Sequence, residues 1–326
     1  MAFDGITVAA LVQELRDNLT GGRIAKIAQP EPDELLLTIK TPAGQRKLYI
    51  SASASLPLIY LTDENKLSPM TAPNFCMLLR KHIGNGRITS ISQPKLERII
   101  SLHIEHLNEL GDLCEKKLII EIMGKHSNII FCDDKDMILD SIKHVSAQMS
   151  SVREVLPGRT YFIPDTMEKS DPLSVNEKKF LDTLKEKPVP LGKAIYTSFT
   201  GISPVIAEDI CFLAGLDSQL PASELDDTFL HLFRQFSYYM DDIRNCHFHP
   251  CIYYDGTSPK DFGAVTLSHF SNYTKQEFTS ISEVLNTYYA TKNTLTRIRQ
   301  KSADLRHVVQ TALERNRKKY DLQKKQ

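Results

Sequence analysis

The sequence predicts an α+β protein with an antiparallel sheet domain, a helical region and the start of a long coiled-coil helix. Short strand-like segments follow one another through residues 1–145, and few gaps between them could hold a crossover helix, so antiparallel pairing is favoured. After residue 171 the apolar residues recur at helical spacing instead. From Ser282 to the end there is neither proline nor glycine, which indicates one continuous helix.

The sheet domain is predicted to contain two helices and nine strands. Leu11, Leu15 and Leu19 recur at helical spacing within a helix over residues 7–20, and a second helix spans 73–83. Apolar or alternating segments between turn residues predict the strands, which span 23–28, 34–40, 47–52, 57–61, 87–93, 98–105, 117–123, 128–132 and 137–142.

The helical region contains a candidate helix–hairpin–helix. Its predicted helices span 177–186, 191–200, 205–214 and 224–244. Gly201 separates the second helix from the third, and Ser203 and Pro204 suit the first turn of the third. The glycine would let a phosphate backbone approach closely, and free amides at the helix N-terminus would bind it. A purely structural connector between two helices is an equally good interpretation.

The C-terminal part combines a hairpin with a basic arm. Strands over 251–254 and 264–270 are predicted around a turn at Gly256. Lys+Arg and Asp+Glu both total 40, so the chain has no net charge and is not basic over its whole surface. Residues 291–326, however, contain 11 basic and 3 acidic side chains. Because the predicted helix reaches the last residue without a cap or a return helix, we expect the natural chain to continue and this sequence to be an N-terminal fragment.

These patterns divide the chain into four predicted parts. They are the sheet domain over 1–172, the helix–hairpin–helix domain over 173–240, a β-hairpin segment packing on the sheet domain over 241–281, and the start of a basic coiled-coil arm over 282–326.

The sequence predicts a reduced, cytoplasmic protein without a metal, a cofactor or a membrane partner. The first residues lack a basic segment followed by an apolar core, and no apolar run approaches the length of a membrane helix. Six cysteines are scattered along the chain. The segment from Cys246 to Cys251 contains two cysteines and two histidines, but structural zinc sites usually pair two separate knuckles, so we expect a polar loop.

Two segments carry candidate binding residues. Glu97 and Arg98 place an acid and a base at the start of a strand. Glu121 ends another strand, and Gly124 then permits a bend before a cluster of donors comprising Lys125, His126, Ser127 and Asn128, which can contact phosphate or ribose. A hairpin turn with a polar tip is the simpler alternative for the second segment. The sequence contains no P-loop, dinucleotide turn or nucleophile elbow, so no catalytic residue is predicted.

Several motifs together resemble the NFACT family. They lie at residues 3–5, 21–27, 75–83, 121–130 and 155–158, and the resemblance extends from residue 3 into the basic helix. The resemblance implies an N-terminal NFACT domain similar to that of formamidopyrimidine-type DNA glycosylases, then a helix–hairpin–helix domain and a long coiled coil. The glycosylases use an N-terminal proline as nucleophile, whereas this chain begins Met1-Ala2-Phe3, so base excision is disfavoured.

The resemblance also implies a function in ribosome quality control. RqcH-like members bind large ribosomal subunits that still hold peptidyl-tRNA. They recruit alanyl-tRNA for C-terminal alanine tailing of the stalled chain, while the ribosome itself forms the peptide bonds. The family was first labelled fibronectin-binding protein A, so a fibronectin-binding surface adhesin is the alternative.

Particular positions match the family's tRNA-binding motifs. Its Asp-Arg motif falls on Glu97-Arg98, where glutamate keeps the charge and adds a methylene. Its second element falls on Glu121, Ile122 and Met123 without change. The resemblance therefore implies that these residues bind tRNA. The neighbouring donors complete the predicted site, and they are Lys125, His126 and Asn128.

Overall fold

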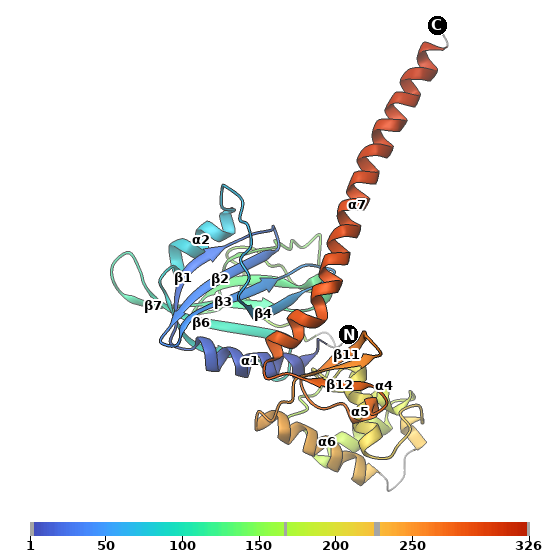
Figure 1. Ribbon diagram of the computed structural model, residues 1–326. Helices are drawn as coiled ribbons and strands as arrows, with labels where there is room; N and C mark the ends of the chain where they lie inside the picture. Colours follow the sequence, from blue (N-terminus) through green and yellow to red (C-terminus); the bar gives the residue numbers. More distant parts are fainter. Residues whose placement is uncertain (1–2, 166–167, 225–228, 325–326) are drawn as a thin grey trace. The chain divides into compact units, whose positions relative to one another are not determined.

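The computed structural model describes residues 3–165, 168–224 and 229–324. The chain divides into two compact units, Met1–Val284 and Leu285–Gln326. The first unit contains the strands and the shorter helices, and the second consists of most of one long helix (Figure 1). These elements confirm the predicted α+β class.

The first helix, α1 (Gly5–Leu19), has a defined cap at its start. The Asp4 Oδ1 atom accepts hydrogen bonds from the amides of Ile6 and Thr7 at 3.1 and 2.9 Å, which satisfies donors that a first helical turn leaves free. The leucines predicted from helical spacing are buried, and α1 packs on the sheet at β5. The helix is therefore held at its start by its own sequence and along its length by the core.

One nine-stranded antiparallel sheet forms the centre of the first unit. Its spatial order is β4-β3-β2-β1-β5-β6-β7-β8-β9. The strands are β1 (Arg23–Ala28), β2 (Glu34–Thr41), β3 (Gly44–Ser51), β4 (Leu58–Thr62), β5 (Arg87–Ser92), β6 (Ile99–Leu107), β7 (Leu113–Glu121), β8 (Asn128–Asp133) and β9 (Ile138–Ser141). All nine predicted strands are present, and their antiparallel pairing is confirmed.

The hairpin of β6 and β7 is longer than predicted. Its strands pair from Ile99 with Glu121 to Leu107 with Leu113. The predicted strand over 117–123 began four residues later than β7 does, because the charged residues at that end interrupt the apolar pattern. Backbone pairing continues there without burial of the side chains, which apolar periodicity does not reveal.

A helix and a strap cover parts of the sheet. Helix α2 (Asn74–Ile83) packs on β1 and β6, and the Arg80 Nε atom donates a hydrogen bond of 2.8 Å to the Ile27 carbonyl. Residues 145–163, here called the strap, lie against the end of the sheet through a bridge at Met137–Thr160 and hydrogen bonds to Ile138 of β9, and a Val145–Val155 bridge folds the strap back on itself. The strap completes an apolar cluster whose buried members are Ile99, Ile119, Ile130, Cys132, Ile138 and Val155.

The helical region packs around an aromatic core. It contains α3 (Glu177–Lys185), α4 (Leu191–Ser198), α5 (Pro204–Leu213) and α6 (Phe229–Arg244), in agreement with the predicted helices. Of the last one, predicted over 224–244, residues 225–228 lie outside the described residues. Phe180 stacks on Phe199 at 5.2 Å between ring centroids and meets Phe236 at 4.6 Å. Clustered rings of this kind bury large apolar surfaces and hold short helices together.

The connection between α4 and α5 packs against the sheet domain. Gly5 N donates a hydrogen bond of 3.0 Å to the Gly201 carbonyl, and a Cβ atom on Gly201 would lie 2.2 Å from the Leu96 carbonyl oxygen. Ser203 caps α5, as predicted. Close packing within the chain therefore explains why glycine stands at position 201, so Gly201 is not evidence that nucleic acid approaches here. That the helix pair binds a phosphate backbone stays a prediction.

The small C-terminal sheet corrects one predicted strand. It consists of β10 (Cys251–Asp255), β11 (Ser258–Gly263) and β12 (Thr274–Glu277) in the order β11-β10-β12. The predicted second strand over 264–270 is wrong, because Asp255 pairs with Ser258 across a two-residue turn and the partner strand starts at once. The apolar residues that suggested the later strand are buried by packing, and Leu267 N donates to the Tyr253 hydroxyl at 2.8 Å.

In the part of the chain that the structure describes, no three His, Cys, Asp or Glu side chains are arranged to hold a metal ion. Cys246 is exposed and its thiol donates to Gln13 Oε1 at 3.3 Å, whereas Cys251 is buried. No described helix combines the length and apolar character needed to cross a membrane.

The long helix α7 (Ile281–Gln323) begins in the first unit and forms the second. At its start, the Glu14 carboxylate accepts hydrogen bonds from Ser280 Oγ at 2.5 Å and from Ser282 N at 3.2 Å. Exposed apolar residues recur along the helix at Leu305, Val308, Val309 and Leu313. Their spacing suits a partner helix, and the coiled coil stays a prediction.

Candidate nucleic-acid interface

Strand pairing brings the two predicted binding segments together. Ile99 at the start of β6 pairs with Glu121 at the end of β7, and Ile122 N donates a hydrogen bond of 2.9 Å to the Arg98 carbonyl. Residues 97–98 and 121–128 therefore lie at the same end of the sheet, although more than twenty residues separate them in the sequence. We call this end the site end.

The turn before β6 fixes the position of Arg98. Lys95 adopts a φ of +51°, and Glu97 N donates to the Pro94 carbonyl at 3.0 Å, which closes a tight turn. The Gln93 side-chain amide then donates to the carbonyls of Glu97 and Gly5, both at 2.9 Å. The turn is thus tied to the start of α1 as well as to the sheet, so Arg98 leaves from a well-supported backbone.

Arg98 lies in a group of like charges. In the part of the chain that the structure describes, its guanidinium makes no hydrogen bond or ion pair. Burial lowers the pKa of Lys169, and the Arg98 charge lowers it further, while Glu97 opposes the shift. Burial raises the pKa of Glu97 against the influence of Lys95 and Arg98. An anionic ligand such as a phosphate would relieve the repulsion among these cations.

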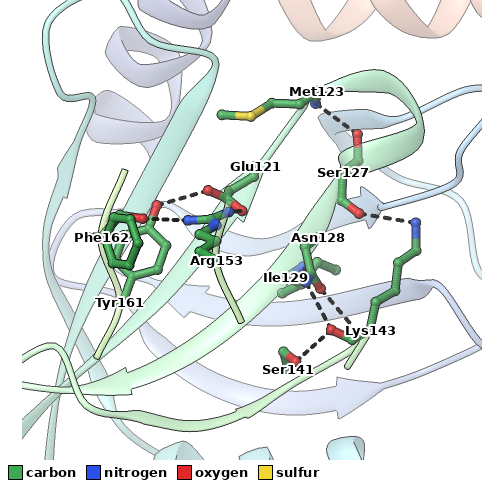
Figure 2. A network of polar contacts seen from close by, with 10 residues as sticks. All are labelled: Glu121, Met123, Ser127, Asn128, Ile129, Ser141, Lys143, Arg153, Tyr161 and Phe162. Carbon is green, nitrogen blue, oxygen red and sulfur yellow. Dashed lines mark hydrogen bonds and ion pairs between the residues drawn. The ribbon is translucent and has the colours of Figure 1, made fainter. Parts of the chain in front are cut away.

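Glu121 faces the interior (Figure 2). Its side chain is buried, forms an ion pair with Arg153 and accepts a hydrogen bond of 3.1 Å from the Tyr161 hydroxyl. Burial raises the pKa of Glu121, and the Arg153 charge opposes that shift. Arg153 also donates to the Phe162 carbonyl at 2.6 Å. Glu121 therefore holds the strap against the sheet and does not present its carboxylate to a ligand.

Ile122 and Met123 also point inward. Ile122 is buried, and Met123 packs against the apolar cluster beneath the strap. The Met123 amide donates to Ser127 Oγ at 2.8 Å, which closes the short helical turn Gly124–His126 (Figure 2). These predicted site residues act on the shape of the loop that follows them.

Asn128 and Lys143 form the frame of that loop. Asn128 is buried, and its Oδ1 atom accepts hydrogen bonds from the backbone amides of Ile129 and Lys143 at 2.9 and 3.1 Å. Its side-chain amide nitrogen donates to the Lys143 carbonyl at 2.9 Å. The Lys143 ammonium donates to the Ser127 carbonyl at 3.1 Å (Figure 2). It also donates to the Ala52 carbonyl. Burial lowers the pKa of Lys143.

Only part of the predicted site can touch a ligand directly. Lys125 and His126 are exposed on the loop, and Arg98 and Glu97 are half-buried in the neighbouring turn. Glu121, Ile122 and Asn128 are buried and can act only by positioning, and Met123 is half-buried beneath the loop. The site end thus presents cations and a histidine on a rigid frame, which suits phosphate and ribose groups.

Sequence reasoning missed four residues that contact or adjoin the predicted residues at the site end. Lys143, Arg153, Tyr161 and Lys169 follow the predicted segments by 15 to 71 residues and belong to no local motif. The one available signal is that a carboxylate ending an apolar strand, as Glu121 does, requires a buried partner. That signal predicts the existence of a partner and does not identify it.

Comparisons with known proteins bear on this arrangement. The model of a family described as NFACT N-terminal and middle domains matches residues 4–326. The chain is 35% identical over 321 residues to the Rqc2 homolog RqcH of Bacillus subtilis (strain 168), covering 98% of this chain and 54% of that protein. It is 32% identical over 327 residues to the protein of the same name from Streptococcus pneumoniae serotype 2 (strain D39), covering 100% and 54%. The chain spans about half the length of these curated relatives.

Two solved structures are similar to the chain over most of its length. One is the N-terminal part of the fibronectin/fibrinogen-binding protein from Streptococcus suis, with a TM-score of 0.73 and 30% identity. The other is the fibrinogen binding protein from Staphylococcus aureus, with a TM-score of 0.74 and 28% identity. Each alignment covers 89% of this chain and 99% of the other.

Proposed function

The chain belongs to the NFACT family, and we propose that it binds tRNA and the large ribosomal subunit in ribosome-associated quality control. In this role the protein recruits alanyl-tRNA for C-terminal alanine tailing of stalled nascent chains, and the ribosome supplies peptidyl transfer. The similarity to RqcH proteins of other bacteria supports the proposal. The activity is proposed for the cytoplasm, where the ribosomes are.

The single observation that supports tRNA binding best is the Arg98 guanidinium. It lies at the site end without a partner among the described residues and close enough to Lys169 to lower the pKa of that lysine. An arginine that needs a counter-charge can form two parallel hydrogen bonds to a phosphate. In this proposal Arg98 contacts the tRNA backbone, and Lys125 and His126 contact the same molecule from the neighbouring loop.

The buried members of the predicted site have a different role in the proposal. Glu121 holds the strap through Arg153 and Tyr161, and Asn128 holds the loop through Lys143. Loss of either frame would move the exposed donors relative to Arg98. The buried residues and the donors are therefore both needed for tRNA binding, but only the donors contribute positive charge to the contact with tRNA.

The proposal is tested by tRNA affinity across a salt series. Arg98→Ala should weaken binding of alanyl-tRNA and reduce the slope of log K against log salt by about one, because one phosphate contact is lost. Arg87→Ala is the matched control, since Arg87 is an exposed arginine of β5. It lies opposite Glu105 of β6 in the strand register, far from the site end. Equal affinities of the wild type and the Arg98 variant at every salt concentration would contradict the site.

The alternative is a fibronectin-binding surface adhesin. It is favoured by one observation, the naming of similar solved structures after fibronectin and fibrinogen binding. Protease treatment of intact cells separates the two proposals, since an adhesin is degraded and a cytoplasmic factor survives. Immobilised fibronectin then provides the direct binding test, with Arg98→Ala expected to leave any such binding unchanged.

A further inference from the structure

The far end of the β6–β7 hairpin exposes three leucines. Residues 105–115, here called the leucine hairpin, extend beyond the buried part of the sheet (Figure 1). Leu107, Leu110 and Leu113 are 68%, 89% and 67% exposed. Leu107 and Leu113 are directly paired across the strands, so they share one face of the hairpin. Apolar side chains gathered on a projecting surface mark an interaction site.

The tip of the leucine hairpin is ordered by its own hydrogen bonds. Asn108 Oδ1 accepts from the amides of Leu110 and Asp112, both at 2.9 Å, and Asn108 N donates to the Asp112 carbonyl at 2.9 Å. Gly111 adopts a φ of +87°, which a turn of this kind requires. Leu110 is therefore presented in a fixed position, and a partner that covers it does not first have to order the loop.

The charged side chains of the leucine hairpin itself are all acidic, and its neighbouring cations are Lys81 of α2 and Lys116, which follows the hairpin. Residues 105–115 contain four acidic side chains and no lysine or arginine. Glu109 pairs with Lys81 of α2 at 3.3 Å, and both side chains remain mostly exposed. A phosphate backbone would be repelled by this surface, and leucine has no ring on which a base could stack. A protein groove lined by apolar residues and rimmed by lysine or arginine is complementary to it.

We propose that the leucine hairpin docks on a basic protein surface of the large ribosomal subunit, while the site end binds tRNA. The choice of the ribosome rests on the proposed function, and the choice of protein over RNA rests on the charges and leucines of the hairpin. Leu110 enters the apolar groove, and Glu109 and Asp112 face the basic rim.

Binding to purified large ribosomal subunits tests the hairpin. Leu110→Ser combined with Leu113→Ser should weaken binding about ten-fold, because two apolar anchors lose their burial in the complex. Leu67→Ser is the matched control, since Leu67 is 97% exposed outside the hairpin. Equal weakening by the control, or no weakening by the double variant, overturns the proposal.

Charge reversal separates protein from RNA as the partner. Glu109→Lys combined with Asp112→Lys should weaken subunit binding if the rim is basic protein, whereas contact with rRNA would make the same change strengthen it. A crosslinking amino acid in place of Glu109 should join the chain to a ribosomal protein, and a crosslink to rRNA overturns the proposal.

The outcome can be distinguished from failure of the proposed function. Arg98→Ala should weaken tRNA binding, and the hairpin variants should bind tRNA as the wild type does. If the wild type binds tRNA but not large subunits, the ribosomal partner is wrong and the tRNA site stands. If the wild type binds subunits and the Arg98 variant keeps full tRNA affinity, the tRNA site is wrong and the hairpin is judged by its own variants.

Discussion

The two ends of the β6–β7 hairpin carry opposite chemistry. At the site end, Arg98 follows a tight turn and lies near other cations. At the other end, the leucine hairpin presents apolar side chains among acids. Nine residue pairs join the ends, and at the usual rise of a strand this separates them by about 27 Å. One rigid pair of strands can thus hold an anion-binding surface and a protein-binding surface at a fixed spacing.

The ends also differ in what supports them. Buried polar networks around Glu121 and Asn128 hold the site end, whereas the leucine hairpin is held by backbone pairing and by Asn108. Loss of the buried polar partners at the site end should therefore cost stability as well as binding. Loss of exposed side chains from the leucine hairpin should cost binding alone.

The largest effect is expected from Glu121→Ala. It leaves Arg153 mostly buried without its counter-charge, which should lower the free energy of unfolding by about 3–5 kcal/mol. Urea denaturation measures the change. Glu115→Ala is the control near the other end, because Glu115 is 42% exposed beside His103 and should cost less than about 1 kcal/mol.

A second variant shows whether the lone charge causes the loss. Glu121→Leu combined with Arg153→Met removes both charges and should recover much of the stability. If Glu121→Ala costs no more than Glu115→Ala, the site end does not depend on its buried ion pair, and the contrast between the ends is wrong in this respect.

Gly201→Ala should have the next largest effect. Gly201 has a φ of +79°, and an added Cβ would lie 2.2 Å from the Leu96 carbonyl oxygen in the turn that precedes Arg98. Backbone strain of about 1 kcal/mol and overpacking of about 1–3 kcal/mol should combine. The matched control is Gly111→Ala in the leucine hairpin, where φ is +87° and nothing lies within 4 Å. Thermal unfolding should show a larger loss for Gly201→Ala, and equal losses would mean that close packing at Leu96 adds nothing.

Much of the fold follows from local patterns, and the site follows from them only in part. The nine strands were predictable because antiparallel neighbours are close in sequence, and the bounds of β1 agree with the prediction. Residues 258–261 were not predicted as a strand, yet they belong to an edge strand, because backbone pairing does not require apolar side chains. Hydrophobic periodicity reports burial, so it fails where a strand is paired but exposed.

The sequence predicted which residues belong to the site, but it did not predict which of them can contact the ligand and which support the fold. Arg98 and Lys125 were expected to contact a ligand, and a ligand can reach both, since Lys125 is exposed and Arg98 is only half-buried. Glu121 was expected to do the same, but its partners Arg153 and Tyr161 come from the strap, more than thirty residues later. A single sequence does not specify which distant side chain balances a buried charge. That pairing decides whether a residue can bind the ligand or instead supports the fold.

Glu97→Gln tests the electrostatics of the site end with a smaller effect. Burial raises the pKa of Glu97 above its ordinary value of 4.5, so the folded state favours the protonated form. This contribution to stability is present below pH 4.5 and is lost as the pH rises through the higher folded-state pKa. The glutamine variant should therefore gain stability relative to the wild type at pH 7 and not at pH 4, as measured by urea denaturation at both pH values.

The same variant should affect tRNA binding. Removing a negative charge beside Arg98 should strengthen binding at pH 7, and Glu109→Gln in the leucine hairpin should leave it unchanged. Weaker binding by Glu97→Gln would instead mean that the carboxylate orients Arg98, and the effect of the charge would then be secondary to geometry.

The smallest effect is expected from Lys125→Ala. Lys125 is exposed on the loop, so its loss should not change stability, and one solvated contact to phosphate should be worth about 0.2–1 kcal/mol, or less than about six-fold in tRNA affinity. The loss should shrink as salt rises, because exposed charges are screened. Lys81→Ala is the control, since Lys81 is 65% exposed and pairs with Glu109 of the leucine hairpin. If Lys81→Ala weakens tRNA binding as much as Lys125→Ala does, the tRNA is attracted by the overall field of the protein. A loss confined to Lys125 means that the ligand lies at the site end, where the sheet places Arg98.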